Sequence, residues 1–536
     1  MEIPIIDIFA GPGGLGEGFS SFLEPEYKDR VFKIVLSIEK EYYAHQTLTL
    51  RSFYRQFSSG HVPSEYYDFV HGRITIDDLY KAHPEQAEDA KKEAWIAQLG
   101  EDDKAVPNKE IDNRISDALN GNEDWLLIGG PPCQAYSVVG RSRRKDKLLD
   151  EEKDPRVGLY KQYLRILAVH NPAVFVMENV KGLLSARTES NYVFESIIRD
   201  LSNPVKAYRN EDARNSSPLE CPGYRIYSVV TKPESFDDNN NPVFKPKEFL
   251  IHSEKYGIPQ ARHRVILLGI RNNINIEVPK VLTIEREVGV EQVLNGLPKL
   301  RSGLSKKKDT KTNWISAIKA ISKNGILNKV DKDIRDEIIN HLQTLNIAPD
   351  NIGDEFVPFN VSVDYEPRWF LNENLKGACN HRSRGHMESD LLRYLFISCF
   401  GKVRGYSPNL EDFPEELLPA HKNVQVGIKE KKFADRFRVQ IANAPGKTIT
   451  SHISKDGHYY IHPDPAQCRS LTVREAARIQ TFPDDYFFCG PRTAQFIQVG
   501  NAVPPLLANK IARIVFDVCK EINQNRATKD IVAETI

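Results

Sequence analysis

Apolar runs that end in glycine or polar residues recur along this chain. Ile3 to Ala10, Phe32 to Ile38, Trp125 to Ile128 and the segment 173–184 are each typical of a buried strand bounded by a turn. Between the first two runs, residues 11–19 read GPGGLGEGF, which predicts a glycine turn followed by a helix. Strands that alternate with helices predict an α/β fold with an open, mostly parallel sheet.

The glycine turn and the strand after it predict a cofactor site. Gly11, Gly13 and Gly16 form a G-x-G-x-x-G pattern, which lets the backbone approach a ligand and aims helix N–H groups at it. The second strand ends in Glu39, at the spacing where a carboxylate can accept hydrogen bonds from ribose hydroxyls. These residues favour a nucleotide-type cofactor, and they leave NAD and S-adenosylmethionine equally open. A glycine-rich turn without a ligand is the alternative.

A candidate nucleophile follows the third strand. Cys133 lies in GGPPCQAYSVVG (129–140), directly after the apolar run. Taken alone, a free cysteine is more often a small buried hydrophobic residue. Glu178 favours the interpretation of Cys133 as a nucleophile, because the strand in 173–184 carries this carboxylate to the same carboxyl edge of the sheet. A thiol beside a carboxylate at this edge is typical of an enzyme site.

Two arginines precede a later strand. In YGIPQARHRVILLGI (256–270), Arg262 and Arg264 stand two residues apart. Side chains at period two point to one side of a strand, so the two guanidinium groups could together hold a base carbonyl or a phosphate. A solvated, charged strand end is the alternative interpretation.

Six strings, in this order, resemble the ordered motifs of the carbon-5 cytosine methyltransferases. They are DIFAGPGGLGEGF, GGPPCQAYS, MENVKG, QARHRV, RSLTVREAARIQTFPDDY (469–486) and QVGNAVPP (498–505). The resemblance implies a Rossmann-like, S-adenosylmethionine-dependent methyltransferase domain with a mostly parallel sheet, plus a smaller target-recognition domain. It also implies that the chain is a DNA (cytosine-5-)-methyltransferase.

The resemblance assigns catalytic roles to four residues. Cys133 would add to carbon 6 of cytosine, and Glu178, with a raised pKa, would donate to ring nitrogen 3. Arg262 and Arg264 are similar to the family's pair that holds the base carbonyl. No side chain is assigned to removal of the proton from carbon 5, and a water molecule is one candidate.

The resemblance also implies S-adenosylmethionine as the cofactor. The residues expected to bind it are Phe9 at the adenine, Gly11, Gly13, Gly14 and Leu15 around the amino-acid part, Glu39 on the ribose, and Asn501 and Val503 at the C-terminal side. Both ends of the chain are therefore expected to pack in one domain. One motif departs from the family, because Arg73 stands in HGRITIDD (71–78) where an acid usually contacts the adenine amino group. Either Asp77 or Asp78 substitutes for that acid, or the contact is lost.

We expect three segments. Residues 1–271 form the catalytic and cofactor-binding domain with a helical insertion at about 79–122, residues 272–465 form the target-recognition region, and residues 466–536 return to the catalytic domain. Residues 138–160, rich in lysine and arginine, suit a mobile loop that closes over a flipped cytosine, with a solvated basic loop as the alternative.

The recognition region offers several candidate contacts to DNA. These are Lys306 to Lys308, Trp314, Trp369, and four residues of CNHRSRGHMESDLLRY (379–394), namely His381, Arg382, Arg384 and His386. The four residues of that string could contact phosphates or bases. They could equally be internal partners of Glu388 and Asp390.

Composition limits the partners. Lysine plus arginine equals aspartate plus glutamate at 73 each, so affinity for nucleic acid must come from local basic patches. Seven cysteines without a C-x-x-C pair argue against a zinc site and for a reducing compartment. With no apolar signal or membrane-spanning run, we expect a cytoplasmic protein that binds no membrane, and without a C-x-x-C pair we expect no metal. The resemblance, without a visible chromatin-reading extension, implies a prokaryotic protein.

We expect the partner to be double-stranded DNA, with a cognate restriction or defence complex as a further candidate. Three alternatives stay open: a tRNA cytosine-5 methyltransferase of the same family, a DNA-binding regulator without turnover, and a NAD-dependent oxidoreductase. The absence of a Cys-Phe-Thr string weakens the first alternative. The intact Cys133, Glu178 and arginine pair weaken the second, and GGPPCQAYS is unexplained by the third.

Overall fold

The structure is a computed structural model of the 536-residue chain. It describes every residue except 1, 25, 27–29, 59, 101, 132–154, 187–191, 213–219, 324, 420–423, 425–435 and 536. Within helices, the side chains of 155–158, 209–212 and 527–535 are also outside the description.

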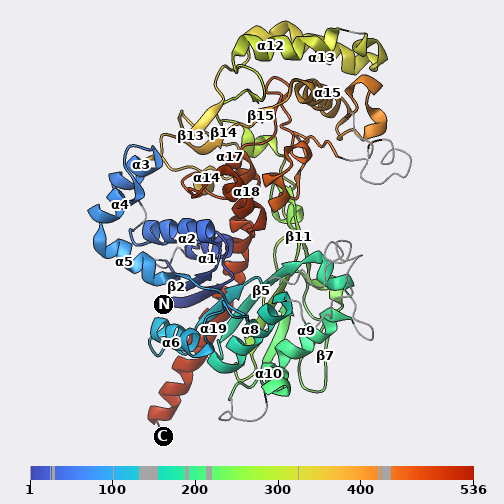
Figure 1. Cartoon of the computed structure of the whole chain (residues 1–536). Coiled ribbons are helices and arrows are strands. Elements are labelled where there is room, and N and C mark those ends of the chain that lie inside the picture. Colours follow the sequence, from blue (N-terminus) through green and yellow to red (C-terminus); the bar gives the residue numbers. More distant parts are fainter. Residues whose placement is uncertain are drawn as a thin grey trace.

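A mixed sheet organises the lower body of the molecule (Figure 1). Its strand order is β3-β2-β1-β4-β5-β11-β6, and β9 pairs with β11 beside this path. The strands are β1 (Ile3–Ile8), β2 (Phe32–Glu39), β3 (Ala94–Ile96), β4 (Leu126–Gly129), β5 (Val174–Val180), β6 (Tyr224–Ser228), β9 (Leu250–His252) and β11 (His263–Arg271). Strands β1 to β5 run parallel, and β11 is antiparallel to its neighbours. The predicted α/β fold with a mostly parallel sheet is confirmed.

Helices cover both faces of this sheet, which explains why its strands are mostly apolar. On β1, Ile5 packs into one core together with α1 and α19, whereas Ile6 and Ile8 pack into a second core with α6, α8 and α9. The helices are α1 (Gly14–Ser20), α6 (Asn108–Leu119), α8 (Pro155–His170), α9 (Val193–Ser202), α10 (Pro204–Asp212) and α19 (Pro505–Thr535). Strands that are buried on both faces have no alternating pattern, so they read as continuous apolar runs.

The region predicted as a helical insertion at about 79–122 contains a strand. Four helices flank the edge of the sheet, namely α2 (Tyr42–Arg55), α3 (Ser64–Val70), α4 (Ile76–Ala82) and α5 (Pro84–Glu93). After α5 the chain forms β3, which pairs in parallel with β2. Most of the region is helical, in α4, α5 and α6, but the strand was not predicted, because a strand of three residues is too short to show a periodic pattern.

A second body lies above the first in Figure 1 and has its own core. Trp314 and Ile318 of α12 (Lys311–Lys319), Ile338 of α13 (Lys332–Thr344) and Leu395 of α15 (Glu388–Arg404) pack together there. The segment that precedes this body behaves differently, because the residues Leu282, Val290 and Leu297 belong to the core beside the sheet. The separate core therefore begins near Leu304, later than the expected boundary at 272.

Short elements connect the two bodies. They are α11 (Glu291–Leu294), α14 (Pro367–Phe370) and the two-stranded pairs β10 (Gln260–Ala261) with β16 (Gly446–Lys447), β12 (Gly303–Leu304) with β15 (Gly385–His386), and β13 (Gly353–Pro358) with β14 (Gly377–Arg382). The pair β7 (Ser235–Phe236) with β8 (Pro242–Val243) belongs instead to the lower body, beside β6 (Figure 1). Among the helices that the structure describes, none combines the length and the apolar character needed to cross a bilayer.

The C-terminal segment returns to the first body, as expected. It forms α17 (Val473–Ile479), α18 (Arg492–Asn501) and α19, and α19 packs against α1. The arginines of RSLTVREAARIQ are buried rather than solvated. Arg469 forms an ion pair with Glu475 at 2.6 Å, and Arg478 forms one with Asp484 at the same distance.

Candidate active site

The predicted glycine turn follows β1, and its backbone has an uncommon geometry. Phe9, Gly11 and Gly13 all have positive φ angles, of 57°, 58° and 91°. A positive φ is costly for a residue with a side chain, so Phe9 is held in an uncommon conformation. A Cβ on Gly11 would meet no atom within 4 Å, so the turn faces open space at this point.

Glu39 holds this turn in place at the end of β2. Its Oε2 accepts a hydrogen bond from the Gly11 backbone N–H at 2.7 Å, and its Oε1 accepts one from the Glu41 N–H at 2.7 Å. Burial raises the pKa of the Glu39 carboxyl, and these N–H groups oppose that rise. Each carboxylate oxygen can accept a second bond, so Glu39 keeps acceptor capacity for a ligand hydroxyl.

The C-terminal segment closes the other side of the turn. A Cβ on Gly14 would collide with the backbone carbonyl oxygen of Val503, and the hydroxyl of Tyr486 donates to the carbonyl of Pro12. Leu15 is buried in the same core, and Asn501 ends α18 with an exposed side chain. Both chain ends therefore build this region, as expected.

A buried ionic network supports the turn, and the sequence reasoning missed it. Arg51 of α2 donates to Glu17 of α1 at 2.5 and 2.9 Å, and to Asp485 at 3.0 Å. Tyr54 donates to the other oxygen of Asp485 at 2.7 Å. Glu17 lies 34 positions from Arg51 and Asp485 lies 434 positions from it, so no local pattern could reveal the network.

Asp7 is a second residue that the sequence reasoning missed. It is the last residue but one of β1, is 1% exposed, and has no hydrogen-bond partner for its carboxyl oxygens among the described residues. Burial raises its pKa to about 8, with Arg55 opposing the rise. A polar residue inside an apolar run is the only signal that the sequence offered.

The chain leaves β4 toward the candidate nucleophile at the same edge of the sheet. Asn179 of β5 donates from Nδ2 to the carbonyl of Pro131 at 3.3 Å, and its Oδ1 accepts from the Val180 N–H at 2.9 Å. Asn179 thereby fixes the point where the chain leaves the sheet. Cys133 and residues 138–154 of the predicted basic loop lie outside the described residues, whereas residues 155–160, predicted as the end of that loop, begin helix α8.

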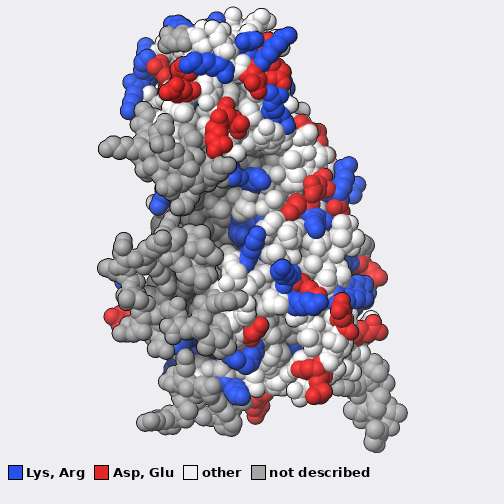
Figure 2. Space-filling view, turned by 90° about the vertical axis from the view of Figure 1, so that its right-hand side faces the viewer, with Lys and Arg blue, Asp and Glu red and all other residues white. Residues whose placement is uncertain are grey.

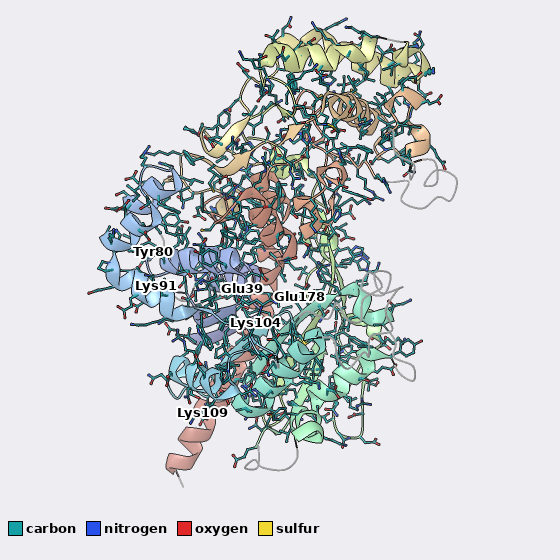
Figure 3. All side chains as sticks on the ribbon, viewed as in Figure 1. Glu39, Tyr80, Lys91, Lys104, Lys109 and Glu178 are labelled. Carbon is teal, nitrogen blue, oxygen red and sulfur yellow. The ribbon has the colours of Figure 1, made fainter. Side chains whose placement is uncertain are left out.

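Glu178 and Arg264 form an ion pair beside that exit. Glu178 Oε1 lies 2.7 Å from Arg264 Nε, and both side chains are 14% exposed. The antiparallel register of β5 and β11 brings them together, because Arg264 pairs with Val180, two residues beyond Glu178. A Cβ on Gly130 would lie 3.0 Å from Glu178 Oε2, so the backbone passes close to this carboxylate where β4 ends. Figure 3 places Glu39 and Glu178 in the middle of the molecule, where the sheet ends below the upper body.

Arg262 makes different contacts from Arg264. It is 1% exposed, and its terminal nitrogens donate to the carbonyls of Ile449 at 2.6 Å and Gly500 at 3.1 Å. Its neighbour Gln260 accepts from the Ile449 N–H at 2.7 Å. In this arrangement Arg262 ties the C-terminal segment to β11, and its contact to a base remains a prediction.

Asp77 and Asp78 are the two acids that could replace the adenine-contacting residue, and the contacts of neither support that role. Asp78 caps α4 by accepting from Thr75, and both Asp77 and Asp78 are exposed. Arg73 forms an exposed ion pair with Asp68. The residue that pairs with Glu39 on the adjacent strand is Ile96, at the end of β3, and Ile96 is 47% exposed.

The basic string 379–394 is mostly internal. His381 and His386 are buried, and burial lowers their pKa values to about 4 and about 3. Arg384 donates to the Ile453 carbonyl and lies 4.3 Å from the centre of the Phe496 ring. The acids of the string have other partners, Lys307 for Glu388 and Arg393 for Asp390.

Other candidate DNA contacts also prove structural. Trp314 is fully buried and donates to Ser302, and Trp369 donates to the Thr481 carbonyl at 2.8 Å. Arg382 is exposed, 3.8 Å from Asp354. Of the string's four basic residues, Arg382 therefore has the side chain most open to a phosphate.

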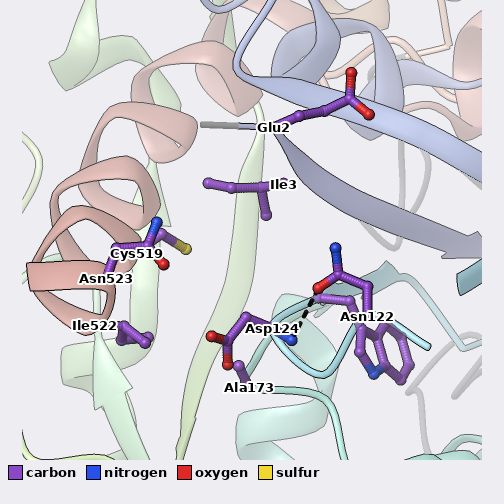
Figure 4. Close-up of a pocket in the computed structure, with 9 residues that line it drawn as sticks. Glu2, Ile3, Asn122, Asp124, Ala173, Cys519, Ile522 and Asn523 are labelled. Atoms are coloured by element: carbon purple, nitrogen blue, oxygen red, sulfur yellow. Dashed lines mark hydrogen bonds between the residues drawn. The ribbon is translucent and has the colours of Figure 1, made fainter. Parts of the chain in front are cut away.

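A cavity of about 280 Å³ lies at the opposite edge of the sheet (Figure 4). Ile3, Trp125 and Ala173 line it at the starts of β1, β4 and β5, and Cys519 of α19 closes it. Ligands in open parallel sheets bind at the carboxyl ends of the strands. This cavity is therefore separate from the candidate active site.

Comparisons with known proteins show the family of this chain. The family model for C-5 cytosine-specific DNA methylase matches residues 87–208 and 234–517. The Type II methyltransferase M.Bpa9945I of Bacillus paralicheniformis is 33% identical over 96% of this chain and 98% of its own. The DNA (cytosine-5-)-methyltransferase M.ApeKI of Aeropyrum pernix is 26% identical over 75% of this chain and 82% of its own.

Among solved structures, a candidate DNA modification methyltransferase from an E. coli prophage is 19% identical. It covers 97% of this chain and 100% of its own, with a TM-score of 0.48. The family match and the identity to M.Bpa9945I span most of the chain. The chain therefore belongs to the C-5 cytosine-specific DNA methylase family and is a DNA (cytosine-5-)-methyltransferase.

Proposed function

We propose that this protein binds S-adenosylmethionine at the turn after β1 and methylates a cytosine flipped out of duplex DNA. One observation carries the proposal. The Glu39-bound glycine turn, the Glu178–Arg264 pair and the chain leading to Cys133 all lie at one edge of the sheet. A cofactor and a base held there would be neighbours, as methyl transfer requires.

The residues of the turn fit the proposed cofactor. Gly11 opens onto free space, and Glu39 keeps acceptor capacity beside it for the ribose hydroxyls. When bound, S-adenosylmethionine supplies an electrophilic methyl group. Phe9, Gly13, Gly14, Leu15 and Val503 shape the turn or pack behind it, and Asn501 is exposed at the end of α18.

Cys133 is the proposed nucleophile. Carbon 5 of cytosine is a poor nucleophile until the ring is made electron-rich. Addition of the Cys133 thiolate to carbon 6 forms a carbon–sulfur bond and turns the ring into an enamine. Carbon 5 of the enamine would take the methyl group as the sulfur–methyl bond of the donor breaks and S-adenosylhomocysteine leaves. Loss of the carbon 5 proton to water and expulsion of the thiolate then restore the aromatic ring.

Glu178 is proposed to handle the charge that this addition places on the ring. A proton held between the Glu178 carboxyl and ring nitrogen 3 relieves that charge. Arg264 forms an ion pair with Glu178 Oε1 and so restrains the carboxyl. The other oxygen, Oε2, lies beside Gly130, from which the chain leads to Cys133. Arg262 acts behind them as a positioning residue by holding Ile449 and Gly500.

The DNA is proposed to lie between the two bodies. On the face shown in Figure 2, lysine and arginine side chains gather along the middle, while both signs of charge mix above and below. The upper body, with its own core from about Leu304, would read the target sequence. Because relatives are named Type II methyltransferases, we propose that the protein is the modification arm of a restriction system.

A duplex containing 5-fluorocytosine tests the proposed chemistry. Fluorine cannot leave carbon 5 as a proton does, so the reaction should stop with the protein bound covalently to the base. We expect a denaturation-resistant adduct with wild type and with Cys221→Ala, a control at another cysteine with some exposure, and none with Cys133→Ala. An adduct with Cys133→Ala would overturn the assignment of the nucleophile, and an adduct on tRNA alone would move the substrate to RNA.

A further inference from the structure

A cluster of two histidines and one glutamate lies on the hairpin that carries Arg264. His252 ends β9, Glu254 lies in the following 3-10 turn η5 (Ser253–Tyr256), and His263 begins β11. The antiparallel register places His252 directly opposite His263, so both imidazoles lie on one face of the pair. Glu254 reaches the same place from the turn.

The three side chains converge at distances suited to one ion. Glu254 Oε1 lies 2.9 Å from His263 Nε2 and 3.6 Å from His252 Nδ1, and the ring centres are 4.1 Å apart. One ligand atom from each residue lies within 4.8 Å of the other two. A zinc ion bonds nitrogen and oxygen at about 2.0–2.2 Å, so tetrahedral ligand atoms stand about 3.3 Å apart.

The second oxygen of the Glu254 carboxylate also supports a cation in this cluster. Glu254 Oε2 is buried and has no hydrogen-bond partner among the described residues. A carboxylate oxygen taken out of water without a partner is costly, and a cation beside it removes that cost. The site is also accessible, because the side chains of His252 and His263 are 38% and 27% exposed.

We propose that His252, Glu254 and His263 bind a divalent transition-metal ion of the zinc class. Two imidazoles and one carboxylate form a ligand set that zinc accepts, with a fourth position left for water. Imidazole ligands disfavour magnesium and calcium, which take oxygen. The lack of a C-x-x-C pair in the sequence argues only against a zinc site built from cysteines. The ligands proposed here are two histidines and a glutamate, and the register of β9 and β11 brings the histidines together.

The bound ion would stiffen the hairpin that carries the two arginines. Ser253 Oγ accepts from the Arg262 N–H at 3.0 Å and donates to the Gln260 carbonyl at 2.6 Å. The His263 carbonyl accepts from Arg264 Nη1 at 2.9 Å. An ion shared by β9, η5 and β11 would therefore cross-link the strands that position Arg262 and Arg264.

Metal binding to the untagged, chelator-stripped protein tests this site without any methylation assay. Zn²⁺ is titrated against a chromophoric chelator, and Co²⁺ is followed by its visible absorption, whose intensity reports a low-coordinate site. The variants are His252→Asn, Glu254→Gln and His263→Asn. His341→Asn is the matched control, because His341 also lies 3.0 Å from a glutamate but has no second histidine in its cluster.

We expect one tightly bound ion per chain in wild type and in the control. Each of the three variants should bind that ion at least tenfold more weakly, while circular dichroism shows the same helix content as wild type. Equal binding by the three variants would overturn the proposal, as would sulfur-to-cobalt charge-transfer bands, which indicate cysteine ligands. Failure to bind any ion would show that Glu254 serves only as a hydrogen-bond partner of His263.

Discussion

At the scale of single residues, the central feature is the pair formed by Glu178 and Arg264. Arg264 Nε lies 2.7 Å from one carboxylate oxygen, so the ion pair restrains the Glu178 carboxyl at the edge of the sheet where we propose that the base binds. Glu178→Gln keeps the shape but removes the acid function. We expect the methylation rate to fall by about 10²–10⁴-fold, as for loss of a general acid.

Binding of S-adenosylmethionine separates this effect from misfolding. Isothermal titration should give the same cofactor affinity for Glu178→Gln and wild type, because Glu39 and the turn are untouched. Glu88→Gln, an exposed change on α5, is the control and should leave the rate unchanged. A variant at Glu178 with full activity would exclude its proposed role.

Asp7 gives a prediction for pH. Its pKa is raised to about 8 by burial in the folded protein, whereas an unfolded chain gives a value of about 4. Between these values the folded state holds a proton that the unfolded state has lost. The contribution of Asp7 to stability is therefore complete below about pH 4 and declines as the pH rises toward 8.

Asp7→Asn cannot ionise, so it should lack this decline. We expect the urea midpoint of wild type to fall relative to that of Asp7→Asn between about pH 5 and pH 9. Parallel curves for the two proteins across this range would contradict the raised pKa of Asp7.

The sequence predicted residues that end strands, and it missed those whose role depends on long-range packing. Glu39 and Glu178 could be placed because a strand's end is visible as the end of an apolar run. Arg262 was expected to point with Arg264, yet it binds carbonyls 187 and 238 positions away. Period-two alternation holds only within a regular strand, and Arg262 lies just before β11 begins.

At the scale of elements, buried ion pairs join α1, α2 and the C-terminal segment. Arg51 contacts both Glu17 and Asp485, and its side chain is 7% exposed. Removing one member of such a network leaves the others charged and buried. We expect Arg51→Ala to lower the free energy of unfolding by about 3–5 kcal/mol.

Urea unfolding measures this loss, with Arg73→Ala as the control. Arg73 also pairs with an aspartate, but its side chain is 66% exposed, so its removal should cost less than about 1 kcal/mol. Equal losses in the two variants would mean that the buried network adds nothing beyond a surface pair.

The element that the sequence missed is β3. The helix-forming residues around it are abundant, and Ala94–Ile96 is too short to interrupt their pattern. Its place in the sheet depends on pairing with β2, which is a contact across more than 50 positions. By contrast, the long runs of β1, β2 and β5 are visible because both of their faces are buried.

At the scale of the whole molecule, two bodies with separate cores share one chain of net charge zero. Affinity for DNA must then come from the local gathering of lysine and arginine seen on one face. Because phosphate contacts release counterions, we expect DNA affinity to fall at least about tenfold between roughly 50 and 200 mM salt. Fluorescence anisotropy measures this dependence, and a flat response would exclude a phosphate-binding face.

The measurement that tests the account most directly is transfer of labelled methyl groups from S-adenosylmethionine to duplex DNA, followed by base-resolution mapping of methylcytosine. Wild type and Cys133→Ala are compared, with tRNA in parallel. We predict 5-methylcytosine in one short DNA motif with wild type and none with Cys133→Ala. Methylation by Cys133→Ala, or transfer to tRNA and not to DNA, would contradict the account.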